Sequence, residues 1–501
     1  MQQTADPANS NQSSLFYAVF FYVAPAMFIG TLDQTIVASA LPTISTKLGG
    51  FGNIAWVVTA YMLAATVAAP LYGKLGDALG RRRALLWAVA VFTAGSILCA
   101  LSPDLNVLIV ARAAQGLGGG GLMTLSLALI GEAVSPRERG RFQGWFGAVF
   151  ALASSIGPVA GGTLTELWGW RSIFWINVPL GAIATYGTLR LQSRSGLVRF
   201  KFDPYGTLTF VIATVSLLLT FDAGPKVGWT SFNTLSLLVV ALVSYAALWK
   251  IERVAKDPLI NLDLLADPVL WRSAVCVLLY AVMFFAAIVG LPLLLQLVLS
   301  MSPSGSGLML IPLTLAQVVV STITGYRISA TGRPRAPMTL GLFVATLGFL
   351  LMALFLGEGA FAICLASALF GLGLGTTMPA AQTLAQWTAG SQQLGAAVAM
   401  VTFARSVGGT LGAALAGALL TAALRSNNPA LVSSIENALV TSGTHITLTP
   451  IQSSQIAHAF RFVFGSLALI AFVASCIART LPNVDLAASP ARIGTIPGSS
   501  S

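Results

Sequence analysis

The sequence predicts an all-α, polytopic membrane protein with fourteen transmembrane helices, arranged as two six-helix repeats plus two inserted helices. Three observations support this fold class: the composition, the number of apolar runs and the distribution of basic residues. Of 501 residues, 56% are hydrophobic and 9% are charged, whereas a soluble domain carries about 25% charged residues. The net charge of +11 does not indicate nucleic-acid binding, because the basic residues are scattered along an apolar chain.

Apolar runs recur fourteen times along the chain. About 20 residues cross the hydrocarbon core of a bilayer, and lipid forces the backbone polar groups of such a run to pair within a helix. We therefore expect one helix for each run. The runs lie at 15–41, 54–73, 84–101, 106–131, 142–163, 172–190, 204–222, 232–250, 272–298, 306–326, 337–357, 360–385, 396–421 and 460–480.

The basic residues predict the orientation. With the N-terminus inside, the large majority of Lys and Arg fall in inner loops and tails, as the positive-inside rule requires. An even number of spans returns the C-terminus to the same side. We expect a multi-pass protein of the cell (inner or plasma) membrane with both termini cytoplasmic.

Internal similarity predicts the two repeats. Gly116–Gly118 recurs as Gly371–Gly373, and Gly157 recurs as Gly412 at the same offset. Both copies begin on the inside, as expected for parallel repeats about an axis along the membrane normal. The predicted parts are a cytoplasmic N-terminal tail (1–14), an N-terminal six-helix bundle (15–190), two inserted helices with basic and polar linkers (191–271), a C-terminal six-helix bundle (272–480) with an outer loop (422–459), and a cytoplasmic C-terminal tail (481–501).

Asp33 lies within the first apolar run, in the stretch Leu32–Val37. A carboxylate inside the bilayer costs about 2.5–3.5 kcal/mol on insertion scales. A residue this costly indicates a function, and the chemistry of a carboxyl group in a membrane favours proton or cation handling during transport.

Arg112 is a second intramembrane charge, in the fourth run. Arg112, Gln115 and Gly116 share one small, polar helical face, which we expect to point into protein or water rather than lipid. One interpretation is an arginine that snorkels at a helix end. The other is an ion pair with Asp33, since both residues fall in the outer half of their spans.

A glycine- and arginine-rich turn joins the second and third runs. The turn is either a tight turn with a topogenic basic cluster or a conformational latch. In the latch, the carboxylate of Asp77 pairs with arginine or faces a helix N-terminus. The acidic residue favours the latch, because it adds nothing to a topogenic signal. The residues are Gly73, Asp77, Gly80, Arg81, Arg82 and Arg83.

The fifth run carries Gly157, Pro158, Gly161 and Gly162. Small residues four apart let helices approach closely, and proline removes a backbone donor and bends a helix. The segment is therefore either a packing motif or a hinge or gate.

Weaker signals concern a substrate cavity between the repeats, near mid-membrane. We expect adaptable apolar and hydrogen-bonding side chains to line it. The candidates are Gln34, Gln115, Met123, Met378, Gln382 and Arg405.

Other chemistry is not expected from this sequence. The four cysteines and two histidines have no metal or redox spacing. We find no nucleotide-binding loop and no cluster of nucleophile and base. The sequence thus predicts no cofactor, no metal and no enzymatic activity.

Taken together, these motifs resemble those of the fourteen-span drug:proton antiporters of the major facilitator superfamily. The resemblance implies the major facilitator fold, a role of Arg112 in proton transfer, and a gate at Gly157 and Pro158. It also implies export from the cytoplasm driven by proton entry. The similar stretches are Leu32–Pro42, 73–83, the run from Arg112, Gly157–Gly162, and Trp168–Gly181 with Asn177-Val178-Pro179.

The expected function is proton-coupled efflux of lipophilic or amphiphilic drugs by alternating access, giving drug resistance. The alternative is a dedicated proton-coupled exporter of one endogenous metabolite or natural product. The expected partners are a small lipophilic or amphiphilic substrate, protons and the lipid bilayer, with no nucleic acid, and the chain is expected to be a monomer.

Overall fold

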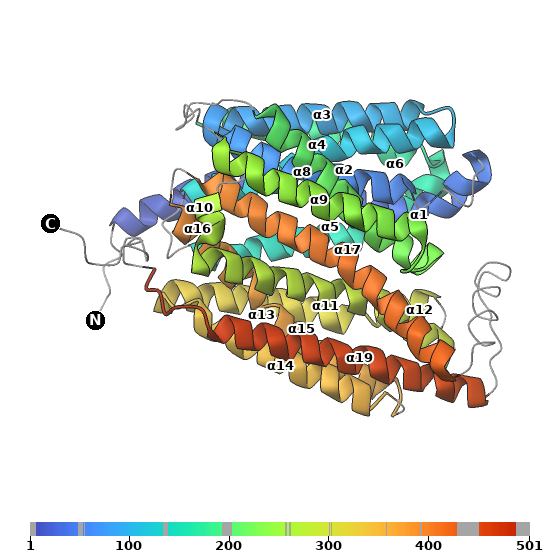
Figure 1. The fold of residues 1–501 in the computed structure, drawn as a ribbon. Coiled ribbons are helices and arrows are strands. Elements are labelled where there is room, and N and C mark those ends of the chain that lie inside the picture. Colours follow the sequence, from blue (N-terminus) through green and yellow to red (C-terminus); the bar gives the residue numbers. More distant parts are fainter. Residues whose placement is uncertain are drawn as a thin grey trace.

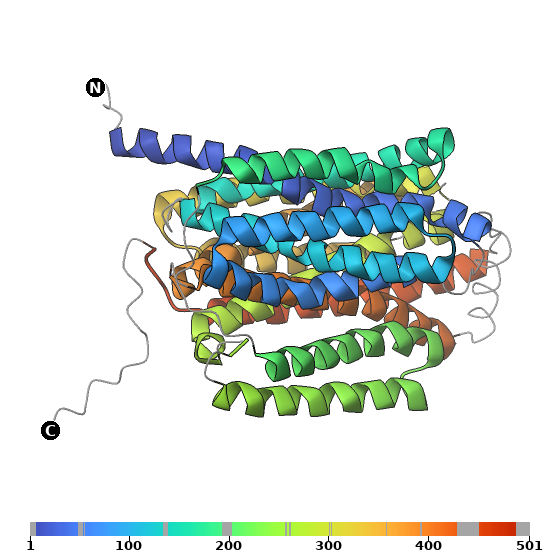
Figure 2. The same cartoon turned by 90° about the horizontal axis from the view of Figure 1, so that it is seen from above.

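In the computed structural model, helices joined by turns make up the residues that the structure describes, which are 7–48, 54, 56–133, 139–192, 203–255, 258–259, 262–299, 301, 303–356, 358–390, 393–427 and 450–486. The long helices run side by side in one elongated bundle (Figure 1). Helix α1 begins and α19 ends at the same end of this bundle, which we call the terminal end (Figures 1 and 2). The expected outer loop 422–459 falls largely outside the described residues.

The bounds of the helices follow the apolar runs closely. The first part of the chain forms α1 (Pro7–Leu48), α2 (Trp56–Leu79), α3 (Arg81–Leu101), α4 (Leu105–Ala133), α5 (Arg139–Trp168), α6 (Ser172–Trp175) and α7 (Asn177–Arg190). The middle forms α8 (Pro204–Val227), α9 (Phe232–Val254) and α10 (Leu262–Ala266). The last part forms α11 (Pro268–Leu299), α12 (Pro303–Leu308), α13 (Ile311–Thr331), α14 (Arg335–Leu354), α15 (Ala360–Leu374), α16 (Thr377–Ala389), α17 (Leu394–Asn427) and α19 (Pro450–Arg479).

Twelve helical segments among the described residues are long and apolar enough to cross a membrane. The two expected spans outside this set are 142–163 and 172–190, which fold as α5 and as the α6–α7 pair. Helix α7 has only 14 residues. The chain leaves α5 at Gly169, which has a φ of 82°, and forms the four-residue helix α6 before α7 begins. The protein is therefore a multi-pass membrane protein with twelve candidate spans.

Corresponding glycines make corresponding helix contacts in the two parts of the chain. Gly116 of α4 lies against the backbone of α2, and Gly371 of α15 lies against the backbone of α13, where an added Cβ would be 2.5 Å from the Leu313 carbonyl oxygen. Gly118 and Gly373 approach α3 and α14 with equally little room. Small residues at these crossings allow the backbones to touch.

The helices bury their apolar side chains in separate clusters. One large cluster joins α11 to α19, where Phe349 and Phe370 stack with ring centroids 4.3 Å apart. Two others lie among α1 to α7, one of them with Val398 of α17 added. The α8–α9 hairpin lies along one side of the bundle (green, Figure 2) and packs through Phe210 and Leu248 on Val67 of α2.

Candidate functional site

Asp33 of α1 and Arg112 of α4 form a buried ion pair. The Arg112 Nη1 atom lies 2.6 Å from the Asp33 Oδ2 atom, and the two side chains are 1% and 0% exposed. The pair expected from the sequence is thus present, and Arg112 points into the helix bundle rather than snorkelling to an aqueous boundary. Removing one member of a buried pair leaves an uncompensated charge, which typically costs about 3–5 kcal/mol.

Gln115 connects the two charges. Its Nε2 donates to Asp33 Oδ1 at 2.8 Å, and its Oε1 accepts from Arg112 Nη1 at 2.6 Å. Gln115, one of the residues predicted to line the substrate cavity, is fully buried beside the ion pair. Since Gln115 is one turn from Arg112 on α4, the helix itself aligns both side chains toward Asp33.

A second layer comes from α3 and α7. The Asn177 Nδ2 atom donates to Asp33 Oδ1 at 3.1 Å and to Ser96 Oγ at 2.9 Å. Ser96 Oγ also accepts from Gln115 at 3.1 Å and donates to the Phe174 carbonyl at 3.0 Å. The sequence-based site did not include Ser96, and it named Asn177 only as part of a motif. The available signal was that each is a polar residue within an apolar run.

Arg112 is also held from α2. Its Nε donates to the Val57 carbonyl at 3.0 Å, and its guanidinium carbon lies 4.3 Å from the ring centroid of Tyr61. Cation–π contact with a desolvated ring adds to the stabilisation of the cation. The site therefore draws on six helices, α1, α2, α3, α4, α6 and α7, so a movement of any of them changes the surroundings of Asp33.

The residues expected to form a latch meet where α2 ends, at the terminal end of the bundle. Asp77 Oδ1 accepts from Arg81 at 2.7 Å and from the Gly395 backbone N–H at 3.0 Å, and Oδ2 accepts from the Ala396 N–H at 3.1 Å. Gly395 and Ala396 open α17. Asp77 therefore caps the N-terminus of α17, where the helix dipole favours a negative charge.

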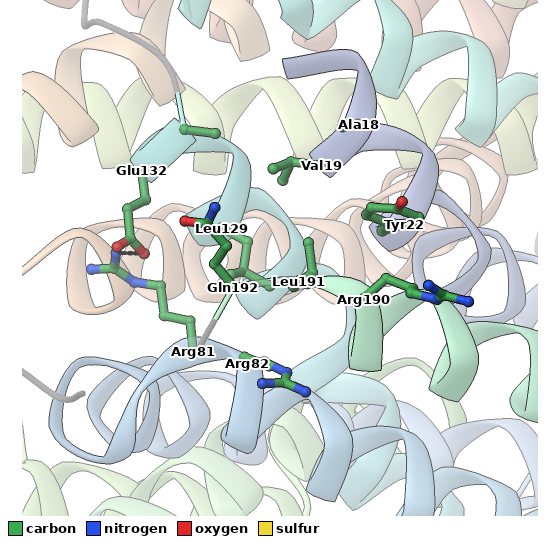
Figure 3. Close-up of a pocket in the computed structure, with 11 residues that line it drawn as sticks. Ala18, Val19, Tyr22, Arg81, Arg82, Leu129, Glu132, Arg190, Leu191 and Gln192 are labelled. Atoms are coloured by element: carbon green, nitrogen blue, oxygen red, sulfur yellow. Dashed lines mark hydrogen bonds and ion pairs between the residues drawn. The ribbon is translucent and has the colours of Figure 1, made fainter. Parts of the chain in front are cut away.

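Arg81 extends this cluster to α4. Its Nη1 lies 2.6 Å from Glu132 Oε2, and Figure 3 shows the two side chains meeting at one wall of a small cavity of about 190 Å³. Glu132 is thus engaged with Arg81 and lies apart from Asp33. Arg82 donates to the Leu189 carbonyl at the end of α7 at 2.9 Å, and Arg83 is exposed.

The glycines of this segment have separate tasks. Gly73 lets α2 touch α17, because an added Cβ would lie 2.6 Å from the Gly395 carbonyl oxygen and 2.8 Å from the Ala399 Cβ. Gly80 has a φ of 94°, a backbone angle that residues with a side chain rarely adopt. It turns the chain between α2 and α3 and so presents Arg81 to Asp77.

Two glycines of α5 lie against α1. A Cβ on Gly157 would collide with the Thr35 side chain, and one on Gly161 would collide with Ser39 and the Ile36 backbone. Gly162 has no atom within 4 Å of such a Cβ, so it does not take part in this contact. The side chain of Pro158 lies outside the described residues. The α1–α5 contact thus abuts the helix segment that carries Asp33.

The remaining candidates for the substrate cavity differ in how far their side chains are exposed. Gln34 is exposed and Gln382 is 1% exposed, while Met123 and Met378 are half-buried against the apolar clusters. The guanidinium of Arg405, from α17, lies 4.9 Å from the ring centroid of Phe150 on α5. In the part of the chain that the structure describes, no group of three potential metal ligands occurs.

Comparison with known proteins identifies the family. The family model described as Major Facilitator Superfamily matches residues 23–413 and 274–494. The chain belongs to the major facilitator superfamily. This superfamily member is therefore related to transporters and not to enzymes, as the motifs indicated.

Curated relatives of this superfamily member include proteins named for drug resistance. The multidrug transporter protein MdtP of Bacillus subtilis is 34% identical over 406 residues, which are 80% of this chain and 74% of MdtP. The multidrug resistance protein Stp of Mycobacterium tuberculosis is 34% identical over 403 residues, 79% of this chain and 74% of Stp. The chain spans 59% of the length of a third relative, the M. tuberculosis transporter Rv1877, at 35% identity over 80% of this chain.

Solved structures share the fold at low identity. The human organic anion transporter MFSD10 superposes with a TM-score of 0.62 at 14% identity, covering 95% of this chain and all of MFSD10. The proton:xylose symporter XylE superposes with a TM-score of 0.59 at 11% identity, covering 95% of this chain and 98% of XylE. At these identities the likeness concerns the fold alone.

Proposed function

We propose that this superfamily member is a proton-coupled efflux transporter, an antiporter that exports lipophilic or amphiphilic drugs from the cytoplasm by alternating access. The observation that carries the proposal is the buried Asp33–Arg112 pair with its amide and hydroxyl partners. The names of MdtP and Stp support the choice of drugs as substrates.

Asp33 is the proposed proton carrier. A nearby cation favours the charged form of a carboxyl group, and burial in an apolar medium favours the neutral form. A helix movement that changes the distance to Arg112 or the access of water would therefore load or unload the proton. Arg112 also donates hydrogen bonds to Gln115 and to the Val57 carbonyl. These two hydrogen bonds would remain while Asp33 is neutral.

The Asp77 cluster is the proposed latch. It joins α2 to α17 at the terminal end, which supports the interpretation that this conformation is closed to the cytoplasm. The tight contact of Gly157 and Gly161 with α1 supports a gate that transmits movements of α5 to Asp33.

The proposed topology has fourteen spans, with α5 and α6–α7 crossing as well, and two six-helix bundles separated by the α8–α9 hairpin. The equivalent contacts of Gly116 and Gly371 support the repeat. We propose a monomer in the cell membrane with cytoplasmic termini. The substrate would bind between the bundles, where the Arg405–Phe150 contact joins α17 to α5.

Transport into inverted membrane vesicles tests the function. An imposed proton gradient should drive ethidium uptake into vesicles that carry the chain, and a protonophore should abolish it. Ethidium uptake that ignores the gradient would refute proton coupling. A host metabolite exported in place of every amphiphile in a broad panel would favour the dedicated exporter over the drug exporter.

A further inference from the structure

The chain beyond α19 stays in contact with the bundle. Residues 480–486 follow α19 as a non-helical segment at the terminal end (dark red, Figure 1), and we call them the C-terminal strap. Leu481, Val484 and Leu486 are 1%, 7% and 3% exposed, and the residues between them are more exposed. The three apolar side chains belong to the large cluster that joins α11 to α19. One side of the strap is therefore packed on the C-terminal part of the bundle.

Two arginines from other helices bind the point where α19 ends. The Nη2 atom of Arg335, at the start of α14, donates to the Arg479 carbonyl at 2.5 Å. The Nη1 atom of Arg272, near the start of α11, donates to the Thr480 carbonyl at 2.6 Å. The last carbonyls of a helix have no partner within it, and the helix dipole favours a positive charge beside them. These arginines thus join α11 and α14 to the beginning of the strap.

The C-terminal strap also binds the turn between α13 and α14. The Leu486 N–H donates to the Gly332 carbonyl at 3.2 Å, and Arg335 Nη1 donates to Asn483 Oδ1 at 3.2 Å. Gly332 ends α13 with a φ of 68°, and an added Cβ there would lie 2.9 Å from Asp485 Oδ1. The strap therefore connects the end of α19 to the end of α13 and the start of α14.

The turn that the strap binds is the second copy of the turn that carries the latch. Gly80 of the first copy recurs as Gly332, and Ser329 stands where the first copy has Asp77. Asp77 joins α2 to the N-terminus of α17 through its charge, and a serine hydroxyl carries no such charge. The second turn lacks this carboxylate and has the C-terminal strap bound to it.

The strapped turn ends the helix that packs on α5. Helix α13 lies against α5, where a Cβ added to Gly147 would be 3.9 Å from Ser321 Oγ. Helix α5 in turn packs on α1, which carries Asp33. A displacement of α13 at its strapped end therefore changes the surface on which α5 moves.

We propose that the C-terminal strap is a conformational brace. Bound to the turn, it fixes the terminal end of α13 to α11, α14 and α19, so that these helices move on α5 as one body. Without the strap, the turn moves independently and α5 receives less of the movement. The holding of the turn is inferred from the contacts of the strap alone, whereas its effect on transport rests on the proposed function.

Hydrogen exchange of the purified protein tests the holding of the turn. A chain that stops after Thr480 lacks nearly all of the strap, and a chain that stops after Leu486 keeps it. Backbone amides in residues 325–338 should exchange about tenfold faster in the shorter protein, because exchange reports local opening. The longer protein should match the parent. Equal exchange of this segment in both truncated proteins would overturn the proposal.

Single substitutions leave the chain complete and so do not depend on the folding of a truncated protein. Arg335→Ala removes the donors to the Arg479 carbonyl and to Asn483, and it should speed exchange of the turn severalfold. The matched control is Arg333→Ala, at an exposed position of the same turn, which should leave the exchange unchanged. Equal effects of the two substitutions would also overturn the proposal.

Ethidium efflux at matched amounts of folded protein tests the effect on transport. The chain that stops after Thr480 should transport severalfold more slowly than the chain that stops after Leu486. Faster exchange of the turn together with equal efflux would overturn the role of the strap in transport. If the parent protein shows no efflux, the proposed function fails, and the exchange experiment still decides whether the strap holds the turn.

Discussion

The Asp33 carboxylate shares its two oxygens between three donors: Oδ2 faces Arg112 at 2.6 Å, and Oδ1 faces Gln115 and Asn177 at 2.8 and 3.1 Å. Arg112 is held in place by the Val57 carbonyl and the Tyr61 ring. The pair is therefore rigid from the α4 side. The surroundings of the Asp33 carboxylate, and with them its protonation, are most simply changed by movement of α1, against which α5 packs.

The first prediction concerns coupling. Asp33→Asn preserves the size of the side chain and one acceptor oxygen but cannot carry a proton. We expect normal expression with proton-driven ethidium efflux reduced to background, because the exchangeable proton is lost. Transport into inverted vesicles measures this, with Glu358→Gln, an exposed carboxylate between α14 and α15, as the control. Full gradient-driven transport by Asp33→Asn would remove Asp33 from the coupling step.

The second prediction concerns stability. Arg112→Gln leaves a buried carboxylate without its cation, and we expect a loss of roughly 3–5 kcal/mol, seen as a lower thermal unfolding midpoint in detergent. Combining Arg112→Gln with Asp33→Asn removes both charges and should recover much of that loss. Two changes that simply add would contradict direct coupling of the pair.

The sequence was sufficient to select Asp33 and Arg112 as candidate functional residues, because charged residues inside a span are rare and costly. Ser96 and Asn177 could not be selected in the same way, since a serine or asparagine in a membrane helix is an ordinary finding. For Asp77, the sequence predicted a choice between an arginine and a helix N-terminus, and the structure has both. Which helix it caps depends on a contact between distant parts of the chain that no local pattern encodes.

The helical fold class was also evident from the composition and the long apolar runs, and the family comparison agrees with it. The number of spans was harder to derive. Helix α7 has only 14 residues and is separated from the four-residue helix α6 at Ile176, and α5 includes polar and basic residues such as Arg141 and Gln143. Hydropathy alone marks such segments weakly.

The third prediction concerns the latch. Arg81→Ala removes the cation between Asp77 and Glu132, so we expect the α2–α17 contact to open more often and turnover to slow severalfold. Spin labels at Leu79, where α2 ends, and at Ala389, where α16 ends shortly before α17 begins, should report a larger share of long distances. The control is Arg83→Ala, the same change at the exposed position two residues on. Equal effects of the two changes would favour the topogenic interpretation of the arginine cluster.

The last prediction concerns the α1–α5 contact, where neighbouring glycines provide a matched pair. A Cβ on Gly157 has no room beside Thr35, whereas one on Gly162 meets no atom within 4 Å. We expect Gly157→Ala to push α5 from α1, at a cost of about 1–3 kcal/mol, and to impair ethidium efflux. Gly162→Ala should leave both stability and efflux near the parent values.

Two measurements separate packing from gating at this contact. The thermal unfolding midpoint reports packing, and the efflux rate at matched expression reports gating. If Gly157→Ala lowers the midpoint but transports normally, the glycines serve packing alone. Because the affected Thr35 lies two residues from Asp33 on the same helix, a gate at this position would act on the proton carrier through displacement of α1, and loss of efflux at matched amounts of folded protein is the result that this mechanism requires.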